Sequence, residues 1–276
     1  MDGVLIIDKP KGMTSHDVIF RLRKIFHQKK FGHSGTLDPD ATGVLVVLCG
    51  KACKVLQFLQ DTDKTYQATL QLGAFTSTDD ISGDVIETKD INLDFNFDEE
   101  LSKFLGKQRQ QVPMTSAKKI HGKKLLDYQR QNIEVPAVYQ DIEIYDIHSL
   151  DTDEFSFEVH CSSGTYIRSL CRDLAIHTDN AGCMASLRRT KVGRFSIDKA
   201  QTLDQLQDNE PVLYPIKSVL SHLPMIDVED PTSIYQGKHF YHACDAQRIC
   251  ICYQDEPIAI YDQIQPGEFV SKRGLW

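Results

Sequence analysis

Long hydrophobic runs, a secretion signal and Cys-x-x-Cys pairs are all absent from this 276-residue sequence. The longest uninterrupted apolar run, Val44 to Cys49, is far too short to cross a bilayer. The N-terminus lacks the basic, apolar and small-residue sections of a secretory signal, so we expect a cytoplasmic protein without a membrane segment. Eight scattered cysteines are too few for a disulfide scaffold, and we expect reduced thiols.

The composition excludes wholesale disorder, because 41% of the residues are hydrophobic and 25% are charged, as in ordinary soluble proteins. No internal repeat or low-complexity tract is present. A chain of this length buries a sizeable core without disulfides and suffices for one large domain plus a small second one.

Positive charge is concentrated in three windows of a chain whose net charge is −8. Residues 9–30, 102–124 and 168–199 each hold seven Lys or Arg side chains and together only four acids, a net charge of +17. The rest of the sequence carries −25. This segregation favours one positive face for a polyanionic partner. The alternative is three solvated surfaces that point in different directions.

Strand and helix patterns alternate up to about residue 200, which predicts a mixed α+β fold. β-rich or alternating apolar residues predict strands at 3–8, 44–49, 66–72 and 155–161. Helical spacing predicts helices after the Thr14-Ser15 cap, through Val55 to Leu59, and after Ser163-Gly164. The polar stretch 207–215 contains two prolines, so we place a domain boundary there. Residues 1–210 then form the main domain and 211–276 a small β module.

The most informative segment for chemistry is residues 32–43, in which two glycines within four residues permit a tight loop. Pro39 biases Asp38 toward an extended backbone, so the carboxylate is presented rather than wound into a helix. Such an aspartate serves as a nucleophile, a general base or a metal ligand. The alternative is an ordinary turn aspartate.

This segment, GHSGTLDP followed by ATGVL, is one of six blocks that occur in a fixed order. The other five are GVLIIDKPKGMTS at 3–15, DKTY with LG at 63–73, P with SAK and GKKL at 113–125, CSSGTYIR at 161–168 and LRR at 187–189. Together, in this order and with this spacing, they resemble the TruB family of tRNA pseudouridine synthases.

The resemblance implies that a uridine in RNA is isomerised to pseudouridine, its base being detached and rejoined through C5. No atoms are gained, so it implies no cofactor. The implied substrate is the T-loop uridine of tRNA, U55 in tRNA numbering, and the implied protein is a monomer. The implied fold is the pseudouridine-synthase fold, a mixed, mainly antiparallel sheet flanked by helices. A small C-terminal β module of the PUA type, which binds RNA, accompanies it.

The resemblance assigns catalytic roles to Asp38, Tyr66 and Arg168. Asp38 is the implied nucleophile, attacking either the ribose C1′ or the uracil ring, and Arg168 is its implied cationic partner. Tyr66 is the implied platform for the target base. From the residues alone, the alternative for Arg168 is an ordinary phosphate-binding arginine at a helix start, and the alternative for Tyr66 is an ordinary core tyrosine.

RNA-binding roles follow from the same resemblance, because a stacked target base must be flipped out before it reacts. His33 matches the position that fills the vacated space, although a surface histidine in a loop hydrogen bond is the alternative. Lys9 is expected to shape the floor of the site first and to contact RNA second. The remaining implied RNA contacts lie on a hinged loop around Gly122 and in the last block: Lys118, Lys119, Lys123, Lys124, Arg188 and Arg189. Thr115 and Leu126 depart from the family, which commonly has tyrosines there.

The sequence leaves two alternative functions, RNA binding without catalysis and nucleoside hydrolysis, and one possible metal site. The first alternative is a non-catalytic tRNA-binding or tRNA-folding protein. The presence of Asp38, Tyr66 and Arg168 together argues against it, because binding alone does not need these three residues in combination. A nucleoside hydrolase needs a second acidic group beside Asp38, and only Asp40 is near in sequence. The zinc-ligand residue types among 239–252 lack the paired spacing of known zinc modules, so we predict no metal.

Overall fold

The computed structural model describes residues 1–60, 62–131 and 133–276. The chain divides into two compact units. The first unit comprises Met1–Pro39, Leu45–Asp61 and Asp198–Trp276, and the second comprises Asp40–Val44 and Thr62–Ile197. Each unit therefore contains segments that are far apart in the sequence.

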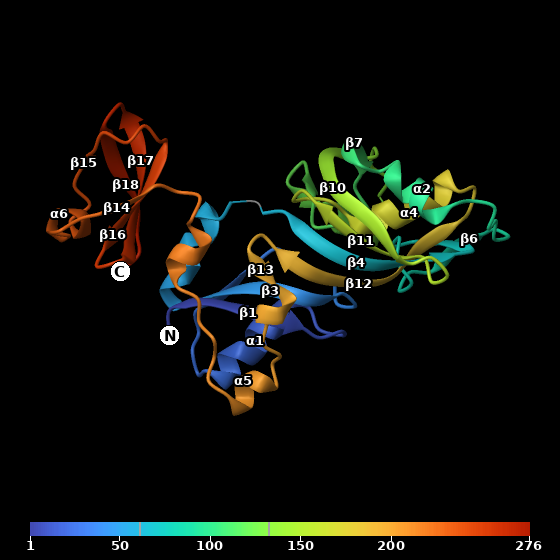
Figure 1. Ribbon diagram of the computed structural model, residues 1–276, viewed down its shortest axis with the longest axis horizontal. Coiled ribbons are helices and arrows are strands. Elements are labelled where there is room, and N and C mark those ends of the chain that lie inside the picture. The colour runs from blue at the N-terminus through green and yellow to red at the C-terminus, as the bar shows by residue number, and fades with distance from the viewer. Residues whose placement is uncertain (61, 132) are drawn as a thin grey trace. The chain divides into compact units, whose positions relative to one another are not determined.

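The first unit is built around strands β1 and β3, which α1 and α5 cover on one side (Figure 1). Its elements before residue 60 are β1 (Gly3–Lys9), α1 (Ser15–Ile25), β2 (Phe31–Ser34), β3 (Thr42–Cys49, whose first three residues belong to the second unit) and the 3₁₀-helix η1 (Gly50–Phe58). After the 3₁₀-helix η2 (Ile197–Lys199) comes α5 (Gln205–Asp208). The predicted strands at 3–8 and 44–49 and the predicted helix after Thr14 are confirmed.

Helix α1 begins where the sequence predicts because Thr14 and Asp17 form a capping box. The Thr14 hydroxyl accepts a hydrogen bond from the Asp17 amide, and the Asp17 carboxylate accepts one from the Thr14 amide. Val18, Ile19 and Leu22 then place an apolar face against β1 and β3.

The second unit contains a mixed sheet with the strand order β12-β4-β11-β10-β7. Strand β12 pairs antiparallel with β4 and parallel with the first residues of β3. The strands of the unit are β4 (Lys64–Leu72), β5 (Ala74–Thr76), β6 (Val85–Thr88), β7 (Gly106–Gln111), β8 (Lys119–Ile120), β9 (Lys123–Lys124), β10 (Tyr139–Asp151), β11 (Ser156–Cys161), β12 (Gly182–Val192) and β13 (Phe195–Ser196). Its helices are α2 (Phe97–Ser102), α3 (Leu125–Arg130) and α4 (Ile167–His177).

Alternation along the strands decides which face of this sheet is buried. In β11, Phe157, Val159 and Cys161 are buried, whereas the side chains between them are only partly covered. Helix α4 packs against β12 and β4, and α2 packs against β10 (Figure 1). The predicted strands at 66–72 and 155–161 and the predicted helix after Gly164 are confirmed.

Three local predictions differ from the structure. Residues 32–34 belong to β2, which pairs with β3, so the tight loop begins only at Gly35. The helix predicted through Leu59 is the 3₁₀-helix η1, which ends at Phe58. The basic loop around Gly122 is a short hairpin, because β8 and β9 pair at Lys119–Lys124 and at Ile120–Lys123.

The C-terminal part of the first unit is a five-stranded sheet with the order β14-β16-β17-β18-β15. Its elements are η3 (Ile216–Val219), β14 (Met225–Asp227), α6 (Thr232–Tyr235), β15 (Phe240–Tyr241), β16 (Arg248–Tyr253), β17 (Glu256–Gln265) and β18 (Glu268–Gly274). One side of this sheet shares an apolar core with η1: Ala52, Val55 and Phe58 pack with Ile216, Leu220, Cys250, Cys252 and Ile260. The small β module predicted from the sequence is therefore present, and it is anchored on η1.

All eight cysteines are free thiols. Among the helices of the described residues, none has the length and apolar character needed to span a membrane.

Candidate functional site

The loop that carries Asp38 is fixed at the residues on both sides of it. The Leu37 amide donates to the Ser15 hydroxyl over 2.9 Å, and this hydroxyl lies 3.3 Å from the Leu37 carbonyl oxygen. The Pro39 carbonyl accepts hydrogen bonds from the Gly12 amide and from the Lys9 ammonium, at 2.9 and 3.0 Å. The main chain around Asp38 is therefore held by the first residue of α1 and by two residues that precede the helix.

Lys9 is fully buried, which is rare for a lysine unless its ammonium group is bound. Its Nζ donates to the carbonyl oxygens of Pro10, Met13 and Pro39, at 2.9, 2.6 and 3.0 Å. The expected role in shaping the floor of the site agrees with these contacts. Burial leaves Lys9 no surface for the RNA contact that was expected second.

His33 and Gly43 lie on the two strands that flank the Asp38 loop. His33 is half-buried in β2, opposite Val47. Gly43 has a φ of 101°, and a Cβ atom there would lie 2.1 Å from the carbonyl oxygen of Arg189. A side chain is excluded because the main chains of β3 and β12 approach too closely.

Tyr66 lies on the buried face of β4, between Val159 of β11 and Arg189 of β12. Only 7% of it is exposed. Arg189 is 1% exposed, and its Nε donates to the Val44 carbonyl over 2.8 Å. This burial favours a structural role for Arg189 over a phosphate contact. Its neighbour Arg188 is partly exposed and donates to the Thr42 hydroxyl over 3.3 Å.

Arg168 lies in the first turn of α4, with its side chain only 7% exposed. Its Nη1 donates to the Thr78 carbonyl over 2.9 Å and to the Thr115 hydroxyl, and Nη2 lies 3.4 Å from the Thr115 carbonyl. The same Nη1 lies 3.6 Å from Oδ2 of Asp80. Several acceptors therefore orient the guanidinium before any substrate is bound.

Asp80 is a contact of Arg168 that the six sequence blocks do not indicate. Its Oδ1 accepts hydrogen bonds from the Thr78 hydroxyl, the Ser82 amide and the Ser82 hydroxyl, at 2.7, 3.0 and 2.5 Å, which leaves Oδ2 facing Arg168. The signal was present in the run TSTDDISGD at 76–84, in which short polar residues surround an aspartate before a glycine. In the sequence Thr115 stands out only as a departure from the family, whereas in the structure its hydroxyl accepts a hydrogen bond from Arg168.

The predicted basic residues of 118–124 lie on the β8–β9 hairpin and its flanks. Lys118, Lys119 and Lys124 are exposed. Lys123 is partly covered, because its ammonium lies over the ring of Tyr128, 4.5 Å from the ring centre. An exposed group of three lysines is suited to phosphate contacts.

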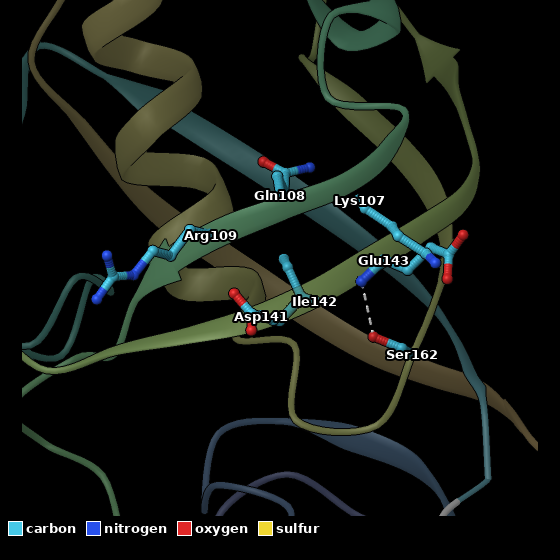
Figure 2. A pocket seen from close by; sticks show the side chains of 7 residues that line it. All are labelled: Lys107, Gln108, Arg109, Asp141, Ile142, Glu143 and Ser162. Carbon is cyan, nitrogen blue, oxygen red and sulfur yellow. Dashed lines mark hydrogen bonds between the residues drawn. The ribbon is translucent and has the colours of Figure 1, made fainter.

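A separate open pocket of about 600 Å³ lies on β7 and β10 (Figure 2). Its lining residues are Lys107, Gln108, Arg109, Asp141, Ile142, Glu143 and Ser162. Lys107 is paired across the strands with Glu143, and Arg109 with Asp141. These opposite charges offset one another, so the pocket does not offer an anion site.

The histidines and cysteines of the C-terminal sheet, which are potential zinc ligands by residue type, are buried in a strand or contact other protein groups. Cys250 and Cys252 are buried in β16, His239 contacts Glu268, and the His242 ring accepts a hydrogen bond from the Cys244 amide. Within the described ranges, no three His, Cys, Asp or Glu side chains are arranged to hold a metal ion.

Comparison with known proteins identifies the family. Residues 23–167 match the N-terminal domain of TruB family pseudouridylate synthases, and residues 168–220 match the C-terminal domain of tRNA pseudouridylate synthase B. The chain belongs to the TruB family. The family predicted from the six sequence blocks is thus confirmed.

Curated TruB relatives extend the match over most of the chain. A tRNA pseudouridine synthase B of Oceanobacillus iheyensis is 43% identical over 244 residues, which cover 83% of this chain and 80% of the relative. The corresponding protein of Bacillus subtilis is 40% identical with the same coverage. That of Alkaliphilus oremlandii is 38% identical and covers 93% of this chain and 91% of its own.

Solved structures confirm the pseudouridine-synthase fold for this TruB chain. A chain in an H/ACA RNP bound to a substrate RNA containing 2′-deoxyuridine matches with a TM-score of 0.73 at 25% identity, covering 99% of this chain and 85% of that one. A chain in a Cbf5-Nop10-Gar1 complex matches with a TM-score of 0.72 at 24% identity, covering 100% and 85%.

Proposed function

We propose that this chain isomerises the T-loop uridine of tRNA, U55, to pseudouridine, with Asp38 as the nucleophile. The observation that carries the proposal is the Asp38 loop, in which Leu37 is tied to Ser15 at the start of α1, and Pro39 to Lys9 at the end of β1 and to Gly12. A nucleophile fixed at both neighbouring residues loses little freedom when the substrate arrives. Relatives named tRNA pseudouridine synthase B, about 40% identical, support the substrate class.

Tyr66 and Arg168 complete the proposed catalytic set. Tyr66 offers its ring to the flipped uracil, since an aromatic face stacks on any base. Arg168 is the proposed cationic partner of Asp38, because a guanidinium can hold both oxygens of a carboxylate and fix their direction. The hydrogen bonds from Arg168 to Thr78 and Thr115 support this role, because they hold the guanidinium in one orientation.

The proposed tRNA contacts are His33, Arg188 and the lysines of the β8–β9 hairpin region, with Arg189 supporting its strand from inside. Residues 211–276 are proposed as a PUA-like RNA-binding module beside a catalytic domain at 1–210. The reaction is an isomerisation that needs no cofactor, and we propose that the protein acts as a monomer in the cytoplasm.

Release of tritium tests the proposed reaction, because forming the C–C glycosidic bond displaces the hydrogen on uracil C5. A tRNA transcript labelled there should release tritium to water without a cofactor and in the presence of a chelator. The product should stay in the chain as pseudouridine. Asp38→Asn should release none while still binding tRNA, since the amide preserves the shape but is not a nucleophile.

Three outcomes would contradict the proposal. Tight tRNA binding without tritium release by the wild-type protein would indicate an RNA-folding protein. Free uracil in place of pseudouridine would indicate a hydrolase. Wild-type turnover by Asp38→Asn would show that another group is the nucleophile.

A further inference from the structure

A second arginine lies one helical turn beyond Arg168 on α4. Residues four apart on a helix share a face, so Arg172 points toward the same loop as Arg168. Its Nη1 lies 3.0 Å from Oδ2 of Asp79, while Arg168 faces the next residue, Asp80. Two successive aspartates therefore meet two successive turns of one helix.

Arg172 is itself held in place from its other side. Its Nε and Nη2 both contact Oδ1 of Asp173, at 3.0 and 2.9 Å. The side chains of Arg172 and Asp79 are 15% and 18% exposed, so water screens their ion pair only partly. A guanidinium bound along two edges has one orientation to offer Asp79.

Asp79 has a left-handed backbone with a φ of 61°, which is unusual for a residue other than glycine. This conformation is unfavourable for most residues with a side chain and needs support from its surroundings. Its carbonyl accepts from the Met184 amide, and the Ile81 amide donates to the Met184 carbonyl, each over 3.0 Å. The left-handed residue sets the direction in which the chain presents Asp80, the next residue.

We propose that Arg172 and Asp79 are positioning residues for the uridine isomerisation. Their ion pair holds the loop in the left-handed turn that aims Asp80 at Arg168, and Asp80 in turn orients the guanidinium. The inference rests on the proposed function and adds to it two residues that touch neither Asp38 nor the substrate in the proposed mechanism.

A second ion pair between the same segments provides a matched control. Lys89 follows β6 and lies 2.5 Å from Asp179, which follows α4. This pair also ties the β5–β6 segment to α4, but it is exposed and lies past the C-terminal end of α4, whereas Arg168 lies in the first turn of the helix. If ion pairing merely stabilised the segment, the loss of activity in every variant, Lys89→Met included, would follow its loss of thermal stability.

The test compares Asp79→Asn, Arg172→Met, their double variant and Lys89→Met by tritium release from labelled tRNA. Asparagine tolerates a left-handed backbone, so Asp79→Asn removes the charge while keeping the turn. We expect kcat to fall about tenfold or more in both single variants, with KM within about twofold of the wild-type value. The double variant should be no slower than the worse single one, because the two residues act as a pair.

Arg172→Lys should recover part of the lost kcat, since it restores the charge but only one contact. Lys89→Met should keep the wild-type kcat. An unchanged kcat in Asp79→Asn and Arg172→Met, or a loss that matches the unfolded fraction seen in thermal melts, would overturn the positioning role. An equal loss in Lys89→Met would overturn it too. A wild-type protein that makes no pseudouridine would instead contradict the proposed function, so the two failures are distinguishable.

Discussion

The ammonium group of Lys9 donates a hydrogen bond to the carbonyl oxygen of Pro39, 3.0 Å away, although thirty residues separate the two in sequence. Pro39 directly follows Asp38, so a buried cation at the end of β1 fixes the main chain next to the proposed nucleophile. The contact links the first sequence block to the second and gives a physical reason for a lysine in the opening strand.

Replacing Lys9 by methionine should destabilise the protein and misplace the Asp38 loop. The substitution leaves the buried carbonyl oxygens of Pro10, Met13 and Pro39 without this donor, at a cost of about 1–3 kcal/mol. Thermal unfolding together with tritium release measures both effects. Lys11→Met is the control, because Lys11 is exposed and should tolerate the change. Equal melting temperatures for the two variants would contradict the role given to Lys9.

A methyl group at Gly43 should disrupt the β3–β12 pairing. Its Cβ would lie 2.1 Å from the Arg189 carbonyl oxygen, so Gly43→Ala should cost at least about 2 kcal/mol, backbone strain included. Gly12→Ala is the matched control, because Gly12 also has a positive φ but no described atom within 4 Å of its Cβ position. Chemical denaturation should show Gly43→Ala as clearly the less stable variant. The reverse order would mean that the strands move apart easily.

Removing Lys118 and Lys119 should weaken the salt dependence of tRNA binding. Each phosphate contact adds about 0.9 to the slope of log affinity against log salt, so the double alanine variant should flatten it by about one to two. Lys103→Ala should leave the slope unchanged, because Lys103 is already paired with Glu100 at 2.6 Å. A titration from low to moderate salt measures this. An unchanged slope in the double variant would show that the hairpin does not contact tRNA.

Alkylation should distinguish the buried cysteines from the accessible ones. Burial raises the pKa of Cys49 to about 12 and that of Cys161 to about 11. Thiolate is the reactive form, so at about pH 8 only on the order of one Cys49 thiol in ten thousand is ionised. Cys244 is half-exposed and should react first with iodoacetamide, as read by peptide mass spectrometry. Early labelling of Cys49 in folded protein would be inconsistent with its burial.

Acid should remove the contribution of the α1 capping box. The Thr14 hydroxyl, and then its amide, hold the pKa of Asp17 below its ordinary value of 3.8. Because the pKa of Asp17 is lower in the folded state, its ionised carboxylate stabilises the folded protein at pH values above the unfolded-state pKa. This stabilisation is lost as the pH falls through the folded-state pKa. The difference in Tm between wild type and Asp17→Asn should therefore be constant near neutral pH and shrink below about pH 4. A difference that stays constant down to pH 2 would contradict this.

The fold was largely predictable because local patterns and tertiary packing agree in this chain. The Thr14 cap, the apolar run after Thr42 and the alternation around Tyr66 each place residues on the side that the structure buries. Prediction failed where the structure of a segment depends on a strand outside its own local pattern. Gly32 and His33 look like loop residues alone, but β3 pairs with them and extends them into a strand.

The site was predictable only in part, for a similar reason. Sequence blocks indicate Asp38 and Arg168, which carry distinctive chemistry in distinctive contexts. They do not indicate Asp80 and Thr115, whose importance lies in contacts with Arg168 that span many residues. The burial of Lys9 was not predictable from the sequence either, because most lysines in proteins are exposed to solvent.

The apolar core shared by η1 and the C-terminal sheet makes residues 211–276 a structural necessity for the first unit. If they were cut away, the faces of Ala52, Val55 and Phe58 that now pack on them would meet water. Such a truncated chain would expose an apolar surface directly after β3, and exposed apolar surfaces promote self-association. The small module is therefore not a detachable accessory, because the strand that follows the Asp38 loop packs into the same apolar core.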